Sequence, residues 1–391
     1  IKLFIFFLIS FFLLTPILII FFQGLYSINN VNELYAPRYI FGSSKLIFLV
    51  SLVVLLISIP LAWVNTMTNF WGRKFIQIFC ILPLGVPAFI SAYAYAEILE
   101  PGGYLSIYFS SFYGFSIRNT FFASIILGLS LFPYVYLLTR IAIINFSARF
   151  IEAAKTMGKS PWQCFFKICL PMAIPGIAAG LALALMETIN DFGVADFFGL
   201  QTLTIGVFQY ISVINDLPSA FSLSLIILII MLLLYIFEQK MRGDKQFNNS
   251  SYESIQWSRY QLSKGKTILV FSLSFLPIFF GFFVPLLFNF FIFINNYEII
   301  DYSNYLSSLV NSMILGSLVG FFCILVSIFI NFYSRFSRNK KFLYYKKIIN
   351  LGYAVPGVVI ALGVLIFIKY LNQFFYFTIL ATLIGLILAL I

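Results

Sequence analysis

Residues 45–64 read KLIFLVSLVVLLISIPLAWV, and Lys45 is the only charged residue among them. A helix of roughly 20 apolar residues crosses the hydrocarbon core of a bilayer, which is about 30 Å thick. A helix also forms all of its backbone hydrogen bonds within its own segment, and lipid offers no other partners for them. The stretch therefore predicts a transmembrane helix and an all-α integral membrane protein.

The rest of the chain repeats this pattern. Of its 391 residues, 62% are hydrophobic and only 9% are charged, whereas soluble domains carry roughly a quarter charged residues. A soluble globular fold is therefore excluded. We expect about ten transmembrane helices, near residues 3–22, 45–64, 75–96, 121–139, 171–189, 219–237, 267–294, 311–330, 348–368 and 374–391.

The distribution of charge predicts how the helices are oriented. Lys and Arg accumulate in cytoplasmic loops. With the N-terminus inside, 20 of the 24 basic residues but only four of the 13 acidic residues fall on the cytoplasmic side. The net charge of +11 therefore indicates membrane topology rather than a nucleic-acid partner, and the lipid bilayer is the expected surrounding.

Residue types needed for catalysis are scarce. The chain has no His, and its four Cys are scattered without a CxxC pair. The usual proton shuttle and commonest metal ligand is thus missing, and neither a disulfide framework nor a zinc site is predicted. No GxxxxGK[ST] motif for binding ATP occurs. We expect a protein that is not an enzyme, with no catalytic residue, no firmly assigned metal site and no bound cofactor.

An internal repeat appears when the chain is compared with itself at an offset of 269 residues. Pro16 then aligns with Pro285, and Val86-Pro87 aligns with Val355-Pro356. Two prolines in one register are harder to obtain by chance than matching leucines. Because six predicted spans, an even number, separate the copies, both copies face the same way and form a parallel repeat.

The repeat predicts how the chain is divided. The first half covers residues 1–238 with six helices and a core at about 42–238, a cytoplasmic linker covers 239–266, and the second half covers 267–391 with four helices. The second copy stops after its fourth span. Since the chain also starts without Met and ends within an apolar run, we expect a truncated second half and a fragment of a longer protein.

The loop between the fourth and fifth spans, which is predicted to lie inside, carries a spaced motif. It reads EAAKTMG at residues 152–158 and, nine residues later, ICLP at 168–171. Helix formers, a glycine that permits a sharp turn, Ser160-Pro161 as a helix start, and a proline opening the next span predict short helices. The fixed positions are Glu152, Ala153, Ala154, Gly158, Ile168, Leu170 and Pro171.

These seven identities resemble the EAA signature of type I ABC importer permeases, whose transmembrane domain has the MetI-like fold. The resemblance implies a cell inner membrane location and an extracytoplasmic substrate-binding protein. It also implies that the loop docks on a dimeric cytoplasmic ATP-binding subunit, which hydrolyses the ATP. Met157, Trp162 and Phe165 would supply apolar contacts and Glu152 a charged one. An ordinary loop helix with an accidental EAA is the plainer alternative.

The likeness continues beyond the loop. Residues 186–193 read METINDFG, and residues 201–206 read QTLTIG. Both are similar to the fused, two-in-one permeases of ferric iron importers, which makes ferric iron the expected substrate. That family carries a second EAA loop, which the repeat would place beyond Ile391. Thiamine, phosphonate or polyamine are alternative substrates. An ion-gradient-driven secondary transporter is an alternative class, favoured by the parallel repeat but not by the EAA loop.

Three acidic residues, Glu187, Asp191 and Asp196, lie at the predicted outer end of the fifth span. Carboxylates near a span usually face the bundle interior or a water-filled path, and residues four apart share one face of a helix. Hard oxygen donors suit a trivalent cation. We therefore predict that these residues line the translocation path. The alternative is that Asp191 caps the outer turn and that Glu187 is interfacial.

Overall fold

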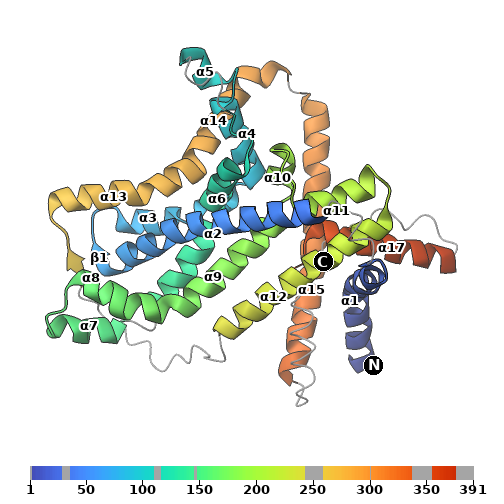
Figure 1. The fold of residues 1–391 in the computed structure, drawn as a ribbon, viewed down its shortest axis with the longest axis horizontal. Coiled ribbons are helices and arrows are strands. Elements are labelled where there is room, and N and C mark those ends of the chain that lie inside the picture. Colours follow the sequence, from blue (N-terminus) through green and yellow to red (C-terminus); the bar gives the residue numbers. More distant parts are fainter. Residues whose placement is uncertain are drawn as a thin grey trace. The chain divides into compact units, whose positions relative to one another are not determined.

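In the residues that it describes, the computed structural model is helical apart from its connections and one pair of two-residue strands (Figure 1). It shows the all-α architecture that the apolar stretches predict. The residues that the structure describes are 2–28, 36–109, 116–144, 148–242, 259–299, 301–336 and 355–375.

The chain forms two compact units, each described by itself. Unit 1 comprises residues 1–40, 202–233 and 294–391. Its helices are α1 (Lys2–Tyr26), α11 (Leu203–Ser212), most of α12 (Leu217–Arg242), α15 (Tyr302–Phe336) and α17 (Gly357–Phe375), with a 3-10 turn at Tyr297–Ile299.

Unit 2 comprises residues 41–201 and 234–293. The strands β1 (Thr68–Asn69) and β2 (Tyr260–Gln261) pair in parallel within it. The halves 1–238 and 267–391 and the linker 239–266 were predicted from the sequence repeat and not from contacts, so the two compact units do not test them, and they stay a prediction. The helices of unit 2 are most of α2 (Ala36–Met67), α3 (Arg73–Phe79), α4 (Ala88–Leu99), α5 (Tyr104–Tyr108), α6 (Thr120–Ala142), α7 (Ala148–Thr156), α8 (Pro161–Cys164), α9 (Leu170–Asn190), α10 (Gly193–Phe197), α13 (Lys264–Ile278) and most of α14 (Val284–Asn296).

Among the described residues, six helices are long and apolar enough to cross a membrane, or seven if one bent pair counts as a span. Each of the six contains a predicted span. The shorter apolar helices Leu14–Tyr26 and Gly357–Tyr370 overlap the predicted spans 3–22 and 348–368, and nearly all of 374–391 lies outside the described residues. The six are Pro37–Met67, Thr120–Ala142, Pro161–Asn190, Leu217–Met241, Lys264–Asn296 and Tyr302–Phe332.

The predicted third span, 75–96, is broken into two helical parts at Val86-Pro87. Its two parts, Arg73–Gly85 and Ala88–Tyr108, meet at 90°. Val86 is extended, with φ −107° and ψ 116°, because a residue before proline is sterically disfavoured from the helical region. Pro87 in turn has no N–H with which to continue the helical ladder.

The core of unit 2 is built on the contact between α6 and α9. Two glycines of α9 let the helices approach closely: a Cβ at Gly180 would lie 2.7 Å from Val135 Cα, and one at Gly176 would lie 2.7 Å from the Leu138 carbonyl oxygen. Small residues allow such backbone approach in membrane helices. The loop that joins α6 to α9 therefore starts and ends on a tightly packed pair.

The first helices of the predicted second half also pack on α6 and α4. A Cβ at Gly281 would lie 2.8 Å from the Leu129 carbonyl oxygen of α6. Gly281 belongs to a π-helical turn, Phe279–Phe283, in which the Phe280 carbonyl has lost its helical partner because Pro285 has no N–H. Tyr95 Oη of α4 donates a hydrogen bond to this carbonyl at 2.5 Å.

Unit 1 is held together in a similar way. A Cβ at Gly363 of α17 would lie 2.5 Å from the Pro16 carbonyl oxygen of α1, so the two backbones touch. Tyr39 Oη donates to Gln209 Oε1 of α11 at 2.7 Å. The sequence did not predict α11, because ten residues are too few for a span.

Candidate functional site

The EAA motif forms a short helix, α7, that ends at a glycine. Gly158 has φ +75°, in the left-handed region. The Gly158 N–H donates to the Lys155 carbonyl and the Lys159 N–H donates to the Ala154 carbonyl, both at 3.0 Å. These two bonds make a Schellman motif, which satisfies carbonyls left without partners at a helix C-terminus. The predicted turn at Gly158 is confirmed.

A second helix, α8, begins directly after this turn. The Gln163 N–H donates to Ser160 Oγ at 3.3 Å, and the Ser160 N–H donates to Gln163 Oε1 at 3.2 Å. This reciprocal capping box satisfies two backbone donors, and Pro161 in the first turn has no N–H to satisfy. The predicted helix start at Ser160-Pro161 is therefore confirmed.

The predicted opening of a new span at Pro171 needs correction. Pro171 does lie in the first turn of α9, but α9 does not start separately, because Pro161–Asn190 is one helical run. A π-helical turn, Phe165–Cys169, joins α8 to α9. We attribute this wider turn to the proline, whose ring crowds the preceding turn and which cannot donate a backbone hydrogen bond.

The other motif residues divide between packing and exposed positions. Ala154 is buried and Glu152 is half-buried, whereas Ala153 is exposed. Ile168 and Leu170 pack against the hydrophobic core of unit 2. The aliphatic members of the motif thus fix the loop to the bundle and leave the turn at its tip open to solvent.

Around this tip, large apolar side chains remain exposed: Met157 by 76%, Trp162 by 69% and Phe166 by 57%. The Trp162 and Phe166 rings stack, with centroids 6.0 Å apart and an angle of 19° between their planes. These two are four residues apart and share one helix face. Phe165, which the sequence predicted in this role, is buried instead, with its ring centroid 5.1 Å from that of Trp63.

One contact to the motif was not predicted from the sequence. Lys155 Nζ lies 4.2 Å from the ring centroid of Tyr260, a cation–π contact made by β2. Burial lowers the pKa of Lys155, and the nearby Glu152 carboxylate partly offsets this. Burial also raises the pKa of Tyr260. Residues 155 and 260 are far apart in sequence, and nothing in the sequence of the predicted linker indicated that its C-terminal part contacts the loop.

The predicted acidic residues lie where α9 ends and α10 begins. The Asp191 N–H donates to the Glu187 carbonyl at 2.9 Å, so Glu187 lies in the last turn of α9 and Asp191 is the C-cap residue that follows it. Asp191 Oδ1 accepts a hydrogen bond from the Val194 N–H at 2.8 Å, as a capping residue does. Asp196 is exposed on α10. The structure thus brings Glu187 and Asp191 together, with Asp191 in the capping position.

Burial shifts the pKa of the Asp191 carboxyl. It raises the pKa of this carboxyl from 3.8 to about 6. The backbone N–H groups of Val194 and Ala195 oppose the shift, and the Glu187 carboxylate adds to it. In the described part of the chain no three His, Cys, Asp or Glu side chains are arranged to hold a metal ion.

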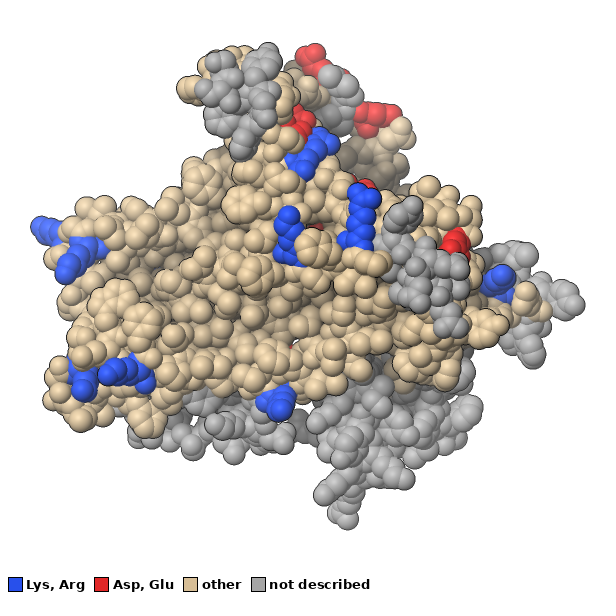
Figure 2. All heavy atoms as spheres, viewed as in Figure 1, with Lys and Arg blue, Asp and Glu red and all other residues tan. Residues whose placement is uncertain are grey.

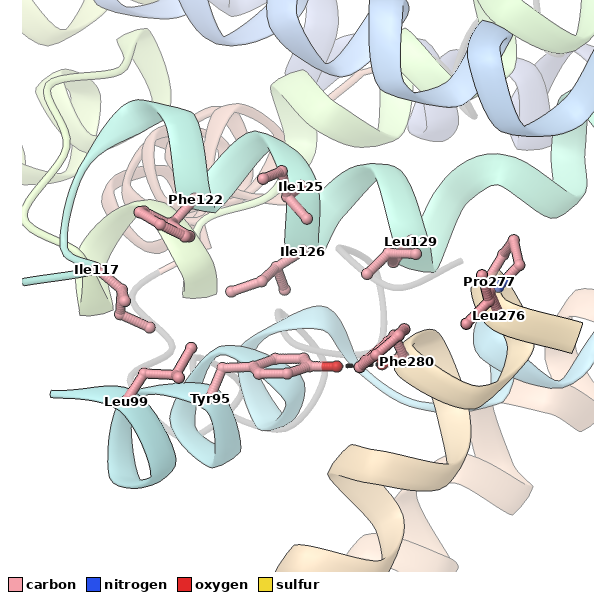
Figure 3. Close-up of a pocket in the computed structure, with 10 residues that line it drawn as sticks. All are labelled: Tyr95, Leu99, Ile117, Phe122, Ile125, Ile126, Leu129, Leu276, Pro277 and Phe280. Atoms are coloured by element: carbon pink, nitrogen blue, oxygen red, sulfur yellow. Dashed lines mark hydrogen bonds between the residues drawn. The ribbon is translucent and has the colours of Figure 1, made fainter. Parts of the chain in front are cut away.

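Unit 2 also contains an apolar pocket of about 370 Å³ between α4, α6 and α13 (Figure 3). The hydroxyl of Tyr95 is committed to the Phe280 carbonyl. A charged substrate would lose its hydration there without gaining a partner, so this pocket does not serve a hydrophilic substrate. Its lining residues are Tyr95, Leu99, Ile117, Phe122, Ile125, Ile126, Leu129, Leu276, Pro277 and Phe280.

The sequence is similar to those of several transport permeases. The chain is 25% identical over 356 residues to the "Fe(3+)-transport system permease protein FbpB 2" of Haemophilus influenzae, covering 89% of this chain and 67% of the relative. It is 29% identical over 165 residues to the "Molybdenum transport system permease protein ModB" of that organism, covering 40% and 71%. It is 30% identical over 182 residues to the "Spermidine/putrescine transport system permease protein PotB", also of H. influenzae, covering 44% and 63%.

The match to a protein family covers the loop, both of its flanking helices and the acidic junction. Residues 54–243 match the family described as the inner membrane component of binding-protein-dependent transport systems. This part of the chain therefore belongs to the family of binding-protein-dependent inner membrane transport components.

Proposed function

We propose that the chain is the permease subunit of an ATP-binding cassette importer and that a separate, dimeric ATP-binding subunit docks on α7 and α8. The observation that carries the proposal is the exposed apolar tip formed by Met157, Trp162 and Phe166. Its backbone is fixed by the turn at Gly158 and the capping box at Ser160. A rigid, exposed aromatic cluster has the properties of a protein-binding hot spot.

The permease itself performs no chemistry in this proposal. Substrate arrives from an extracytoplasmic binding protein. ATP hydrolysis in the partner subunit moves the loop that carries α7 and α8, which we call the coupling loop. Because α9 continues from α8 as one helical run and packs backbone to backbone on α6, a displacement of the tip is passed into the membrane helices. The N-terminus and the loop lie in the cytoplasm, as the distribution of basic residues predicts.

Ferric iron is the substrate that we propose. The relative named for Fe(3+) transport aligns with 89% of the chain, whereas those named for molybdenum and for spermidine/putrescine align with 40% and 44%. The carboxylates of Glu187 and Asp191 at the end of α9 favour a cation over an oxyanion. Polyamines are cations too, so spermidine and putrescine are the competitors to test.

The docking proposal is tested with the full-length chain, the ATP-binding subunit and the binding protein in proteoliposomes. Trp162→Ala should weaken binding of the ATP-binding subunit by about 2 kcal/mol, or roughly 30-fold, and lower ATP-driven uptake. Trp71→Ala is the matched control, since Trp71 is 78% exposed but lies outside the loop. Unchanged binding by the Trp162 variant would contradict docking at this tip.

The substrate is tested in the same vesicles. Uptake of labelled ferric iron should require both ATP and the binding protein, and an excess of molybdate, sulfate or spermidine should leave it unchanged. Uptake driven by an ion gradient without ATP would instead favour a secondary transporter. ATP-driven uptake of spermidine but not of iron would keep the class and replace the substrate.

A further inference from the structure

Three arginines meet near the coupling loop without an acidic partner. Arg73 opens α3, Arg140 lies in the last turn of α6, and Arg259 directly precedes β2. Basic side chains gather at the end of unit 2 that carries α7, α8 and β1 (Figures 1 and 2). In the predicted topology all three arginines lie on the cytoplasmic side.

Hydrogen bonds and strand pairing bring the three together around Asn65. Arg73 Nη1 donates to the Asn65 carbonyl at 3.4 Å. Asn65 Nδ2 donates to Tyr136 Oη at 3.3 Å, and Tyr136 lies one helical turn before Arg140 on the same face of α6. The pairing of Thr68 with Tyr260 places Arg259 at the same end of α2. Consistent with this placement, the charges of Arg140 and Arg259 both act on Arg73.

The positive charge of this cluster is not compensated by the described residues. None of their carboxylates pairs with Arg73, Arg140 or Arg259, and the Nε atoms of Arg140 and Arg259 are buried without a hydrogen-bond partner. The negative end of the α6 dipole stabilises a cation such as Arg140 at its C-terminus. It does not cancel the mutual repulsion of the three arginines. A buried donor without a partner costs free energy, so an anion that supplies several acceptors would be held strongly.

We propose that Arg73, Arg140 and Arg259 form a binding site for a phosphate group, carried by an anionic lipid headgroup or by free phosphate. A guanidinium matches the geometry of phosphate oxygens and binds them in pairs. Basic pockets between membrane helices on the cytoplasmic side are suited to anionic headgroups. The bound phosphate neutralises the point where α2, α3, α6 and the strand before α13 come together.

The experiment measures the thermal stability of the full-length chain in three kinds of nanodisc: phosphatidylcholine alone, phosphatidylcholine with phosphatidylglycerol, and phosphatidylcholine with inorganic phosphate in the buffer. The wild-type chain should be stabilised in the second arm if the group belongs to a lipid, and in the third as well if free phosphate suffices. Wild-type stability that is equal in all three arms would overturn the site.

The variants separate a binding role from a purely structural one. Arg140→Gln with Arg259→Gln should weaken retention of phosphatidylglycerol, measured by native mass spectrometry, at least about tenfold. In neutral lipid the same variant should be no less stable than the wild type, because repulsion is relieved. Lys266→Gln, which removes an exposed charge nearby, should retain the lipid. Retention by the double variant, or its loss of stability in neutral lipid, would contradict the proposal.

Discussion

At each end of the helical run Pro161–Asn190 a side chain accepts a backbone N–H from the helix that follows it, but the surroundings of the two side chains differ. At its start, Ser160 accepts a backbone N–H and the aromatic side chains beside it stay exposed. After its end, half-buried Asp191 accepts the Val194 N–H of the next helix, α10, and burial raises the pKa of its carboxyl. Ser160 and Asp191 thus each fix the backbone at the start of a helix. The side chains around them determine whether the surface is exposed and available to bind a partner.

The largest effect is expected from separating α9 from α6. In Gly180→Leu, the new Cβ would lie 2.7 Å from Val135 Cα, a backbone atom that cannot move aside easily. Overpacking of this kind costs about 1–3 kcal/mol and more when backbone must shift. We expect a lower unfolding temperature in detergent and loss of binding of the ATP-binding subunit at the loop.

Gly316→Leu is the matched control for that change. Gly316 is a helical glycine of α15 with no atom within 4 Å of a Cβ built on it. Its replacement should leave the unfolding temperature unchanged or raise it slightly, because leucine is a better helix former than glycine. A Gly180 variant as stable as the Gly316 variant would show that the two ends of α9 are not held by α6.

A smaller effect is expected at the turn itself. Gly158→Ala introduces no clash, since open space surrounds this residue, but it places a side chain at φ +75°. An L-residue in this region costs about 1–2 kcal/mol. The end of α7 should fray, which amide hydrogen exchange of residues 152–157 would detect as faster exchange.

The matched change Gly265→Ala, also in open space but without a positive φ, should leave that exchange rate unaltered. If both variants behave alike, the Schellman turn contributes nothing to the rigidity of the tip. The capping box at Ser160 would then be the remaining feature that fixes the backbone at the start of the helical run Pro161–Asn190.

Local features of the coupling loop were predictable from sequence, and contacts over long distances were not. Gly158 and Ser160-Pro161 act through their own backbone, so the spacing of the motif was enough to predict the turn and the helix start. Phe165 was predicted to supply an apolar contact to a partner, but it is buried against Trp63 of α2, and the spacing of the motif does not show which of two adjacent phenylalanines packs on a distant helix. The contact of Tyr260 with Lys155 depends on a strand of two residues, which no periodicity reveals.

The overall class followed from composition, since so few charges leave only a membrane fold. The 90° break at Val86-Pro87 is larger than the kink that a proline within a span usually causes, since Pro83 lies in a 3-10 turn and Pro87 directly precedes the next helix. Glu187, Asp191 and Asp196 were predicted as one group by spacing. The structure places Asp196 on the exposed side of α10, so their common role on a translocation path stays a prediction.

The smallest effect is expected at the C-terminal end of α9, where Asp191 should make the stability of the chain depend on pH. Because burial raises the pKa of Asp191 from 3.8 to about 6, the folded chain binds this proton more tightly than the unfolded chain does. Its contribution to stability is therefore fully present below about pH 4, falls as the pH rises to about 6, and stays low above that value. Asp191→Asn keeps a capping acceptor but removes the titration.

The unfolding temperature of the wild-type chain, measured between pH 4 and pH 7, should therefore fall across this range more than that of Asp191→Asn. Asp196→Asn serves as the control because Asp196 is exposed, and it should keep the wild-type slope. Equal slopes for all three chains would mean that Asp191 is solvated when ionised. In that case its carboxylate would be open to a passing cation rather than held in the cap, and the C-terminal end of α9 would resemble the start of α8 in offering its side chains to a ligand.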